Sequence, residues 1–149
     1  FKDGVESERY IITDSDLILD NIKEDWLDKM NYYLDISDAQ KVGFSLDIFN
    51  IPNENPLKSE IIKHESQFWN QPVQDVYIAA VDTTFAIYKE NSLEHFIFPA
   101  LRLNKEYMAT HQPWQLTKDN ITDEDEYFFK HISTEKGDTH WSEKIKNNK

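Results

Sequence analysis

The sequence TDSDLILDNIKEDWLDKMNYYLD, residues 13–35, predicts the element around which the rest of the chain packs. At about 100° per residue, its large apolar side chains fall on one arc of an α-helix that spans residues 14–35. Asp14 or Ser15 can cap this helix, and Asp16 suits the positive end of the helix dipole. We therefore expect a long amphipathic helix whose apolar stripe faces the core. The stripe consists of Ile18, Leu19, Ile22, Trp26, Met30, Tyr33 and Leu34.

The opposite arc of this expected helix is acidic. Asp20, Glu24 and Asp28 follow one another at four-residue spacing, and like charges at that spacing oppose helix formation by roughly 0.2–0.5 kcal/mol per pair. Lys23 and Lys29 relieve only part of this repulsion. The charges therefore serve either solubility, which is the commoner reason, or the recognition of a cationic partner.

The hydrophobic period changes from 3.6 to 2 after residue 40. Residues 42–48 alternate as a half-buried strand, and residues 73–90 are rich in β-branched and aromatic side chains. The second segment is long, so it either bends near Asp82 or forms two strands. In residues 93–103, Pro99 favours an edge position or a bulge. Together these segments predict an antiparallel meander.

Three other segments complete the expected fold. Residues 57–69 fit both periods, and we favour a strand over their second half. Thr122 and Asp125 have the spacing of a capping box, which predicts a helix from residue 123 to about 132 that buries Tyr127, Phe128 and Ile132. Residues 133–149 are polar and lysine-rich, so we expect a mobile tail. The order of elements predicts a single α+β domain over residues 1–149, with the helices packed on one face of a mostly antiparallel sheet.

The charge of the chain limits its partners. The 149 residues include 28 acidic and 16 basic side chains, for a net charge of −12, and only two of the basic residues are arginines. Nucleic-acid binding is therefore not expected, because neutralising phosphates requires clustered Lys and Arg. Residues 1–40 hold eleven acidic residues against four basic ones, a net of −7, and residues 119–126 form a second acidic group.

Membrane association and nucleotide chemistry are not expected either. No window approaches the ~18 consecutive apolar residues of a membrane span, and we expect a cytoplasmic protein. The chain begins at Phe1, so a removed leader, tag or upstream domain stays an open alternative. Cysteine is absent, and the three glycines are not spaced for a phosphate-binding loop. We therefore expect no cofactor. We also expect no metal, because the acidic residue next to His64 or His95 would point to the opposite face of the strand from the histidine.

Two groups of residues are candidates for function. Aromatic side chains could line an apolar ligand pocket with His95 or His64 as its polar group, although such residues more often form core. The acidic residues could bind a basic protein. The possible pocket residues are Phe85, Tyr88, His95, Phe96, Phe98, Tyr107 and Trp114. The possible partner-binding residues are Asp20, Glu24, Asp28, Asp119, Asp123, Glu124, Asp125 and Glu126.

The overall profile is small, strongly acidic, cysteine-free and without a catalytic motif. It is similar to that of immunity proteins and protein inhibitors that neutralise a basic nuclease toxin. The resemblance implies a non-enzymatic inhibitor that covers a cationic site with carboxylates. Two alternatives stay open: a small-molecule-binding or enzymatic α+β domain with an aromatic pocket, and a non-catalytic domain of a larger protein.

Overall fold

The computed structural model describes residues 9–81, 84–89 and 99–131, and these residues form an α+β fold. A six-stranded sheet has the strand order β1-β7-β3-β8-β6-β5, and a three-stranded sheet has the order β2-β9-β4. The six strands of the first sheet are β1 (Arg9–Thr13), β7 (Phe85–Lys89), β3 (Lys41–Gly43), β8 (Ala100–Leu103), β6 (Val76–Ile78) and β5 (Pro72–Val73). The smaller sheet contains β2 (Leu17–Ile18), β9 (Met108–His111) and β4 (Ser45–Leu46).

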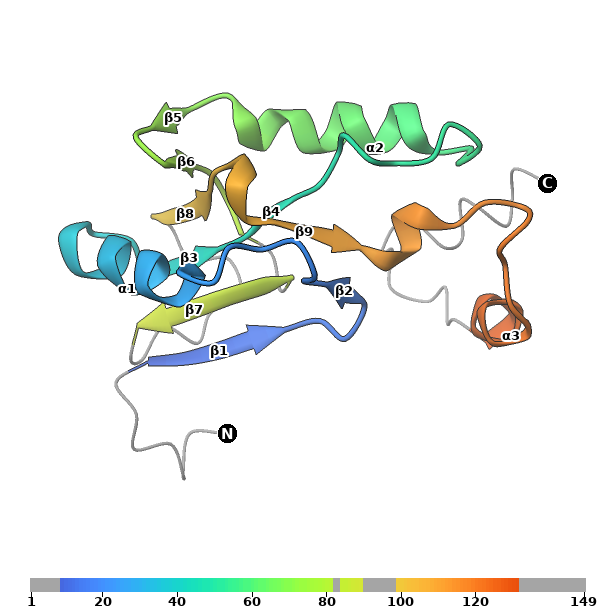
Figure 1. The fold of residues 1–149 in the computed structure, drawn as a ribbon, viewed down its shortest axis with the longest axis horizontal. Coiled ribbons are helices and arrows are strands. Elements are labelled where there is room, and N and C mark those ends of the chain that lie inside the picture. The colour runs from blue at the N-terminus through green and yellow to red at the C-terminus, as the bar shows by residue number, and fades with distance from the viewer. Residues whose placement is uncertain (1–8, 82–83, 90–98, 132–149) are drawn as a thin grey trace.

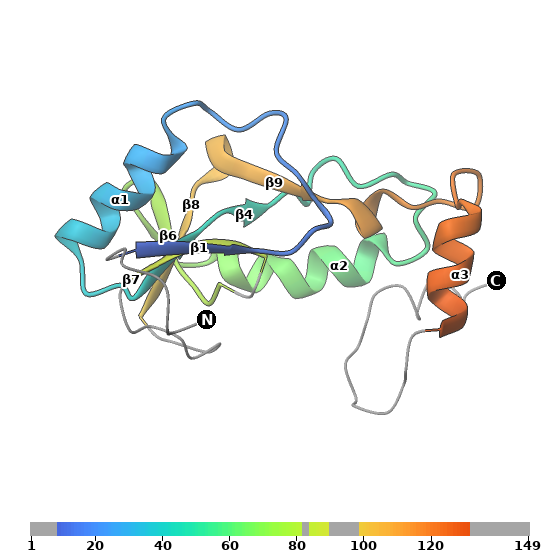
Figure 2. The same cartoon turned by 90° about the horizontal axis from the view of Figure 1, so that it is seen from below.

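In the described residues, three α-helices and three short 3₁₀ turns accompany the sheets. The two views in Figures 1 and 2 place α1 and α3 at opposite ends of the long axis, with α2 beside the sheets between them. The helices are α1 (Trp26–Ile36), α2 (Lys58–Glu65) and α3 (Asp123–His131). The 3₁₀ turns are η1 (Ser66–Trp69), η2 (Lys105–Tyr107) and η3 (Gln112–Gln115).

The predicted antiparallel meander is wrong, because both sheets are mixed. β3 pairs antiparallel with β7 and parallel with β8, and β4 pairs parallel with β9. Residues 41–48 are buried throughout rather than half-buried. Such continuous burial is expected of strands that are covered on both faces. Pro99 also does not mark an edge strand, since β8 lies inside the sheet and begins one residue after the proline.

Gly43 is where the chain leaves one sheet for the other. A Cβ atom at this position would lie 2.4 Å from Val81 Cγ1 and 2.6 Å from the Phe85 carbonyl oxygen. No side chain fits there, so the backbone of β3 can approach β7 closely. Phe44 then separates β3 from β4, and its amide donates to the same Phe85 carbonyl at 3.2 Å.

The predicted helix over residues 14–35 is wrong in its first half. Leu17 and Ile18 form a strand with β9, residues 19–25 make two successive turns, and α1 begins only at Trp26. Because β2 pairs with a strand more than ninety residues later, local periodicity could not reveal it. Met30, Tyr33 and Leu34 of the predicted stripe are buried, whereas Ile18 and Leu19 are exposed.

The second half of residues 57–69 is helical, not a strand. α2 buries Ile61 and Glu65, which are four positions apart and share one helical face. The predicted third helix is confirmed by its capping box: the Thr122 amide donates to Asp125 Oδ2 at 2.9 Å, and the Asp125 amide donates to Thr122 Oγ1 at 3.2 Å. Tyr127 is exposed rather than buried. The side chain of Phe128, Ile132 and the expected tail over residues 133–149 lie outside the described residues.

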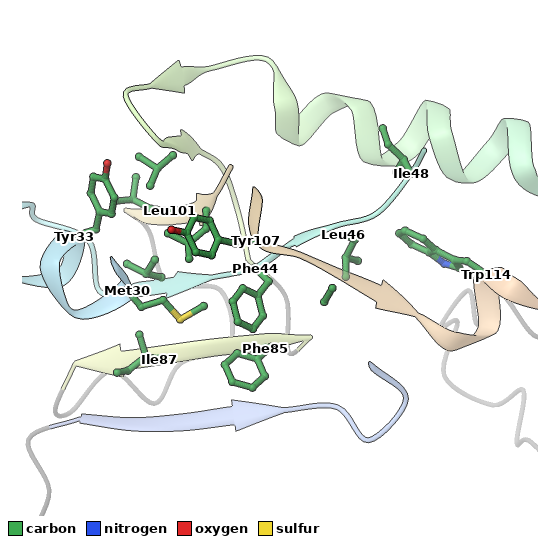
Figure 3. Packing of buried hydrophobic residues seen from close by; sticks show 14 of the residues in the cluster. Met30, Tyr33, Phe44, Leu46, Ile48, Phe85, Ile87, Leu101, Tyr107 and Trp114 are labelled. Atoms are coloured by element: carbon green, nitrogen blue, oxygen red, sulfur yellow. The ribbon is translucent and has the colours of Figure 1, made fainter. Parts of the chain in front are cut away.

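The main core joins side chains of α1 and α2 with those of both sheets. The expectation that the helices pack on one face of the sheet is wrong, because Glu65 of α2 bonds Arg102, which alternates along β8 with the Leu101 and Leu103 side chains that face α1 (Figure 2). Figure 3 shows Met30 and Tyr33 of α1 facing Phe44, Phe85 and other side chains from the sheets. The Trp26 ring meets the rings of Phe44 and Phe85 nearly edge-on, with centroids 5.6 and 5.4 Å away. The helix thus packs on the sheet by aromatic contacts, as its sequence predicts.

Candidate functional site: an acidic hollow on the three-stranded sheet

The three-stranded sheet turns one side to the core and the other to a hollow. Ala109 of β9 and its partner Leu46 of β4 are buried in the main core. Side chains alternate along a strand, so Met108 and Thr110 lie on the opposite side, next to Ile18 of β2. On that side the sheet forms the floor of a hollow of about 250 Å³.

Three segments build the walls of this hollow. They are the loop after β2, the loop after β4, and η2, which follows β8. The lining residues are Ile18, Asp20, Asn21, Asp47, Asn50, Lys105, Met108 and Thr110. We call this site the acidic hollow, because its charged side chains are two carboxylates and one ammonium group.

Two contacts hold the loop after β2 against η2. Lys23 Nζ forms a salt bridge of 2.9 Å with Glu106 Oε2. The hydroxyl of Tyr107 donates to Asp25 Oδ1 at 2.8 Å. Burial of the Tyr107 ring, followed by this hydrogen bond, raises its pKa to about 12. The phenol therefore stays protonated at physiological pH and keeps donating to Asp25.

Asp47 fixes the second wall. Its Oδ1 accepts from the amides of Phe49 at 2.8 Å and Asn50 at 3.2 Å, and its Oδ2 accepts from Asn50 Nδ2 at 2.6 Å. An aspartate that bonds its own following backbone sets a tight turn. The turn leaves Phe49 exposed, with its ring 5.5 Å from the ring of Trp69 and nearly perpendicular to it.

Two of the three charged groups of the hollow lack partners in the described part of the chain. Within it, neither Asp20 nor Lys105 forms a hydrogen bond or an ion pair through its side chain. The amide oxygen of Asn50 likewise accepts no hydrogen bond there, since the Asn50 side chain bonds only through its Nδ2 atom. The hollow thus offers a free carboxylate and a fixed carbonyl acceptor to an external donor.

His111 lies on the other side of β9, facing Asp16. Its Nε2 is 3.3 Å from Asp16 Oδ2, and its ring meets the ring of Trp114 at 5.0 Å. Burial lowers the pKa of His111, and the nearby carboxylates of Asp16, Asp14 and Glu65 oppose this only in part. The Gln112 amide also donates to the Asp16 carbonyl at 2.8 Å, so this pair ties the chain before β2 to the end of β9.

The structure separates the predicted acidic residues into two sets. Asp20 lines the acidic hollow, while Glu24 and Asp28 are exposed at the start of α1. Asp119, Asp123, Glu124, Asp125 and Glu126 lie just before or in the first turn of α3, at the far end of the molecule (Figure 1). Asp125 already accepts hydrogen bonds from Thr122 in the capping box. The two sets therefore do not form one continuous acidic face.

The described members of the predicted aromatic pocket are core residues. Phe85, Tyr107 and Trp114 belong to the main cluster, whereas Tyr88 belongs to a second cluster with Val81, Ala86 and Ala100. Phe85 and Tyr88 thus lie on opposite faces of β7. His64 is exposed on α2, and its ring contacts Phe68. His95, Phe96 and Phe98 lie outside the described residues.

Sequence reasoning missed every lining residue except Asp20 as a site residue. Asn21, Asp47, Asn50, Lys105 and Thr110 come from separate segments, and nothing local says that these meet. The one available signal was Asp47 with Asn50 three positions on, directly after a buried strand, which favours an aspartate-centred turn.

Other classes of site find no support in the described residues. Within residues 9–81, 84–89 and 99–131, no three His, Asp or Glu side chains gather closely enough to hold a metal ion. None of the helices in this part of the chain is both long and apolar enough to cross a bilayer. Comparisons with protein family models, curated proteins and solved structures give no match. A functional inference must therefore rest on the geometry of this molecule.

Proposed function

We propose that the protein is an acidic binding module that inhibits a basic protein partner, in the manner of an immunity protein that covers the cationic site of a nuclease toxin. The proposal rests on the exposed carboxylates of Asp20, Glu24 and Asp28, which form no ion pair within the described residues. A folded protein that leaves acids unpaired around a concave site favours a cationic ligand there. Summed surface charge also speeds the encounter with such a partner.

The region that contains the hollow and the start of α1 is the stronger candidate for this contact. There Asp20 lines the hollow, and the turn between the lining residues Asp47 and Asn50 carries an exposed aromatic side chain, Phe49, which a protein interface can bury. At α3 the acidic residues already have a structural role, because carboxylates in the first turn of a helix interact favourably with the helix dipole. We therefore place the partner on the first set.

The test is affinity capture of a partner from the source cell, followed by association kinetics with the purified partner. Wild-type association should be fast at low salt and slow steeply as the Debye length falls from ~10 Å at 0.1 M to ~3 Å at 1 M. Asp20→Lys, Glu24→Lys and Asp28→Lys together should cut the on-rate by about tenfold or more at low salt.

The matched control is the triple variant Asp119→Lys, Asp123→Lys and Glu124→Lys, which changes the net charge equally at the other end of the molecule. It should reduce the on-rate much less. Equal effects of the two triples would mean that only net charge matters. No effect of either, or capture of no basic protein, would refute the inhibitor proposal.

A further inference from the structure

The acidic hollow is small for a metabolite site but large enough for one side chain. Its volume of about 250 Å³ lies below the ~300–1,000 Å³ typical of ligand and cofactor pockets. Its lining combines the apolar side chains of Ile18 and Met108 with carboxylate, amide and hydroxyl groups. This composition suits a long side chain with an apolar stem and a charged head.

Two free acceptors of the hollow suit a cationic donor. The Asp20 carboxylate has no partner in the described part of the chain, and the same holds for the amide oxygen of Asn50. The Asn50 amide is held by Asp47, so its oxygen is a fixed acceptor that requires no reordering on binding. Among the described lining residues Lys105 is the one basic side chain, whereas Asp20 and Asp47 provide two carboxylates, so the lining carries a net negative charge.

Arginine fits these acceptors better than lysine does. A guanidinium group carries five donors in a rigid planar fork, so it can bond a carboxylate and a separate carbonyl at once. An ammonium group is a compact, strongly hydrated charge that loses more solvation on entering a site. Phe49 lies in the turn between the lining residues Asp47 and Asn50, and its 61% exposed side chain offers an aromatic surface to the residues that flank the arginine.

We propose that the acidic hollow is the recognition site for a single arginine side chain of the basic protein partner, with Asp20 and Asn50 accepting hydrogen bonds from its guanidinium group. This inference rests on the proposed function for the identity of the partner. Whether the hollow binds an arginine side chain can be tested independently of the partner.

The experiment uses the full chain, labelled with ¹⁵N, and N-acetyl-arginine-N-methylamide as the probe. Its neutral isostere, the citrulline derivative, is the matched control, because the two differ in charge but hardly in shape. The arginine probe should give saturable shifts at the amides of Asn21, Asn50 and Thr110, with a Kd on the order of 1–10 mM. The citrulline probe should bind about tenfold more weakly or not at all.

Two variants separate the hollow from general acidity. Asp20→Asn should weaken binding of the arginine probe about tenfold, whereas Glu24→Gln, which removes an equal charge outside the lining, should leave it nearly unchanged. Equal shifts with both probes, equal losses in both variants, or no saturable shift at these amides would overturn the inference.

The outcomes also distinguish this inference from the proposed function. If the arginine probe binds but no basic partner exists, the hollow is supported as an arginine site and the inhibitor proposal is refuted. If a basic partner binds and Asp20→Asn and Phe49→Ala leave its affinity unchanged, the inhibitor proposal stands and the hollow is overturned as its arginine site.

Discussion

The junction between α2 and the six-stranded sheet differs from the acidic hollow in how it treats charge. At the junction, the side chains of Glu65 and Arg102 are each only 3% exposed, and Arg102 Nη1 lies 2.9 Å from Glu65 Oε1. Arg102 Nε also donates to the Ala80 carbonyl at 2.6 Å, and its guanidinium stands 4.1 Å from the centre of the Phe68 ring. In the hollow, Asp20 has no partner among the described residues.

The difference shows that acidity alone says little about function in this chain. A buried carboxylate has its partner supplied by the fold, since an unpaired buried charge is very costly. An exposed carboxylate costs the fold almost nothing, so it is free to bind something else. Glu65 and Asp20 are therefore opposite cases, although a sequence shows both simply as acidic residues.

Breaking the buried pair should have the largest effect on stability. Arg102→Met leaves Glu65 buried without its cation, and we expect a loss of about 3–5 kcal/mol in the free energy of unfolding. Urea denaturation followed by tryptophan fluorescence measures it. The double variant Arg102→Met with Glu65→Leu should recover most of the loss, because no uncompensated charge remains. A loss below ~1 kcal/mol in the single variant would contradict the structural role of the pair.

The partly buried imidazole of His111 lies beside Asp16, and changing it should have a smaller effect on stability than breaking the buried pair. The folded state lowers the pKa of His111 below the ordinary value of 6.5, so as the pH falls through 6.5 the unfolded chain binds a proton before the folded chain does. Stability should thus fall as the pH drops from about 7 to about 5, above the range where most carboxylates titrate (~4). His111→Gln should flatten that decline. An equally steep decline in the variant would mean that other groups cause it.

Neutralising the acidic hollow should have the smallest effect on the fold. Asp20→Asn removes a charge with no partner in the described part of the chain, so the free energy of unfolding should change by less than ~0.5 kcal/mol. Thermal unfolding at two salt concentrations measures this. A loss above 1 kcal/mol would show that Asp20 is structural, like Glu65, and would remove the contrast between the two regions.

Local signals in the sequence predicted local structure well. The capping box at Thr122 and Asp125 fixed the start of α3, and the composition of residues 73–90 indicated strands, which the structure divides into β6 and β7. The α+β class followed from the order of such segments. Each of these predictions depends on residues only a few positions apart.

The errors came from contacts between distant residues. Leu17 and Ile18 continued a helical period, yet pairing with β9 draws them into a strand. In residues 57–69, the charge of Glu65 made its side of the segment look exposed. In the structure Glu65 is buried, because it pairs with Arg102, which is 37 positions later in the sequence. The hollow was hidden for the same reason. Asp20 was named only as part of an expected helix, and its neighbours Asp47 and Lys105 come from other segments.

The position of β7 between β1 and β3 also determines when the chain can fold. Arg9 pairs with Lys89, eighty positions later, and Lys41 pairs with Tyr88 and with Ala100. During synthesis β1 and β3 therefore cannot pair with β7 and β8 until residues 85–103 have left the ribosome. Such delayed pairing slows folding and leaves strand edges exposed to other chains. A chain truncated before β7 would contain most of the apolar residues of the core, but it would lack the strand with which β1 and β3 pair.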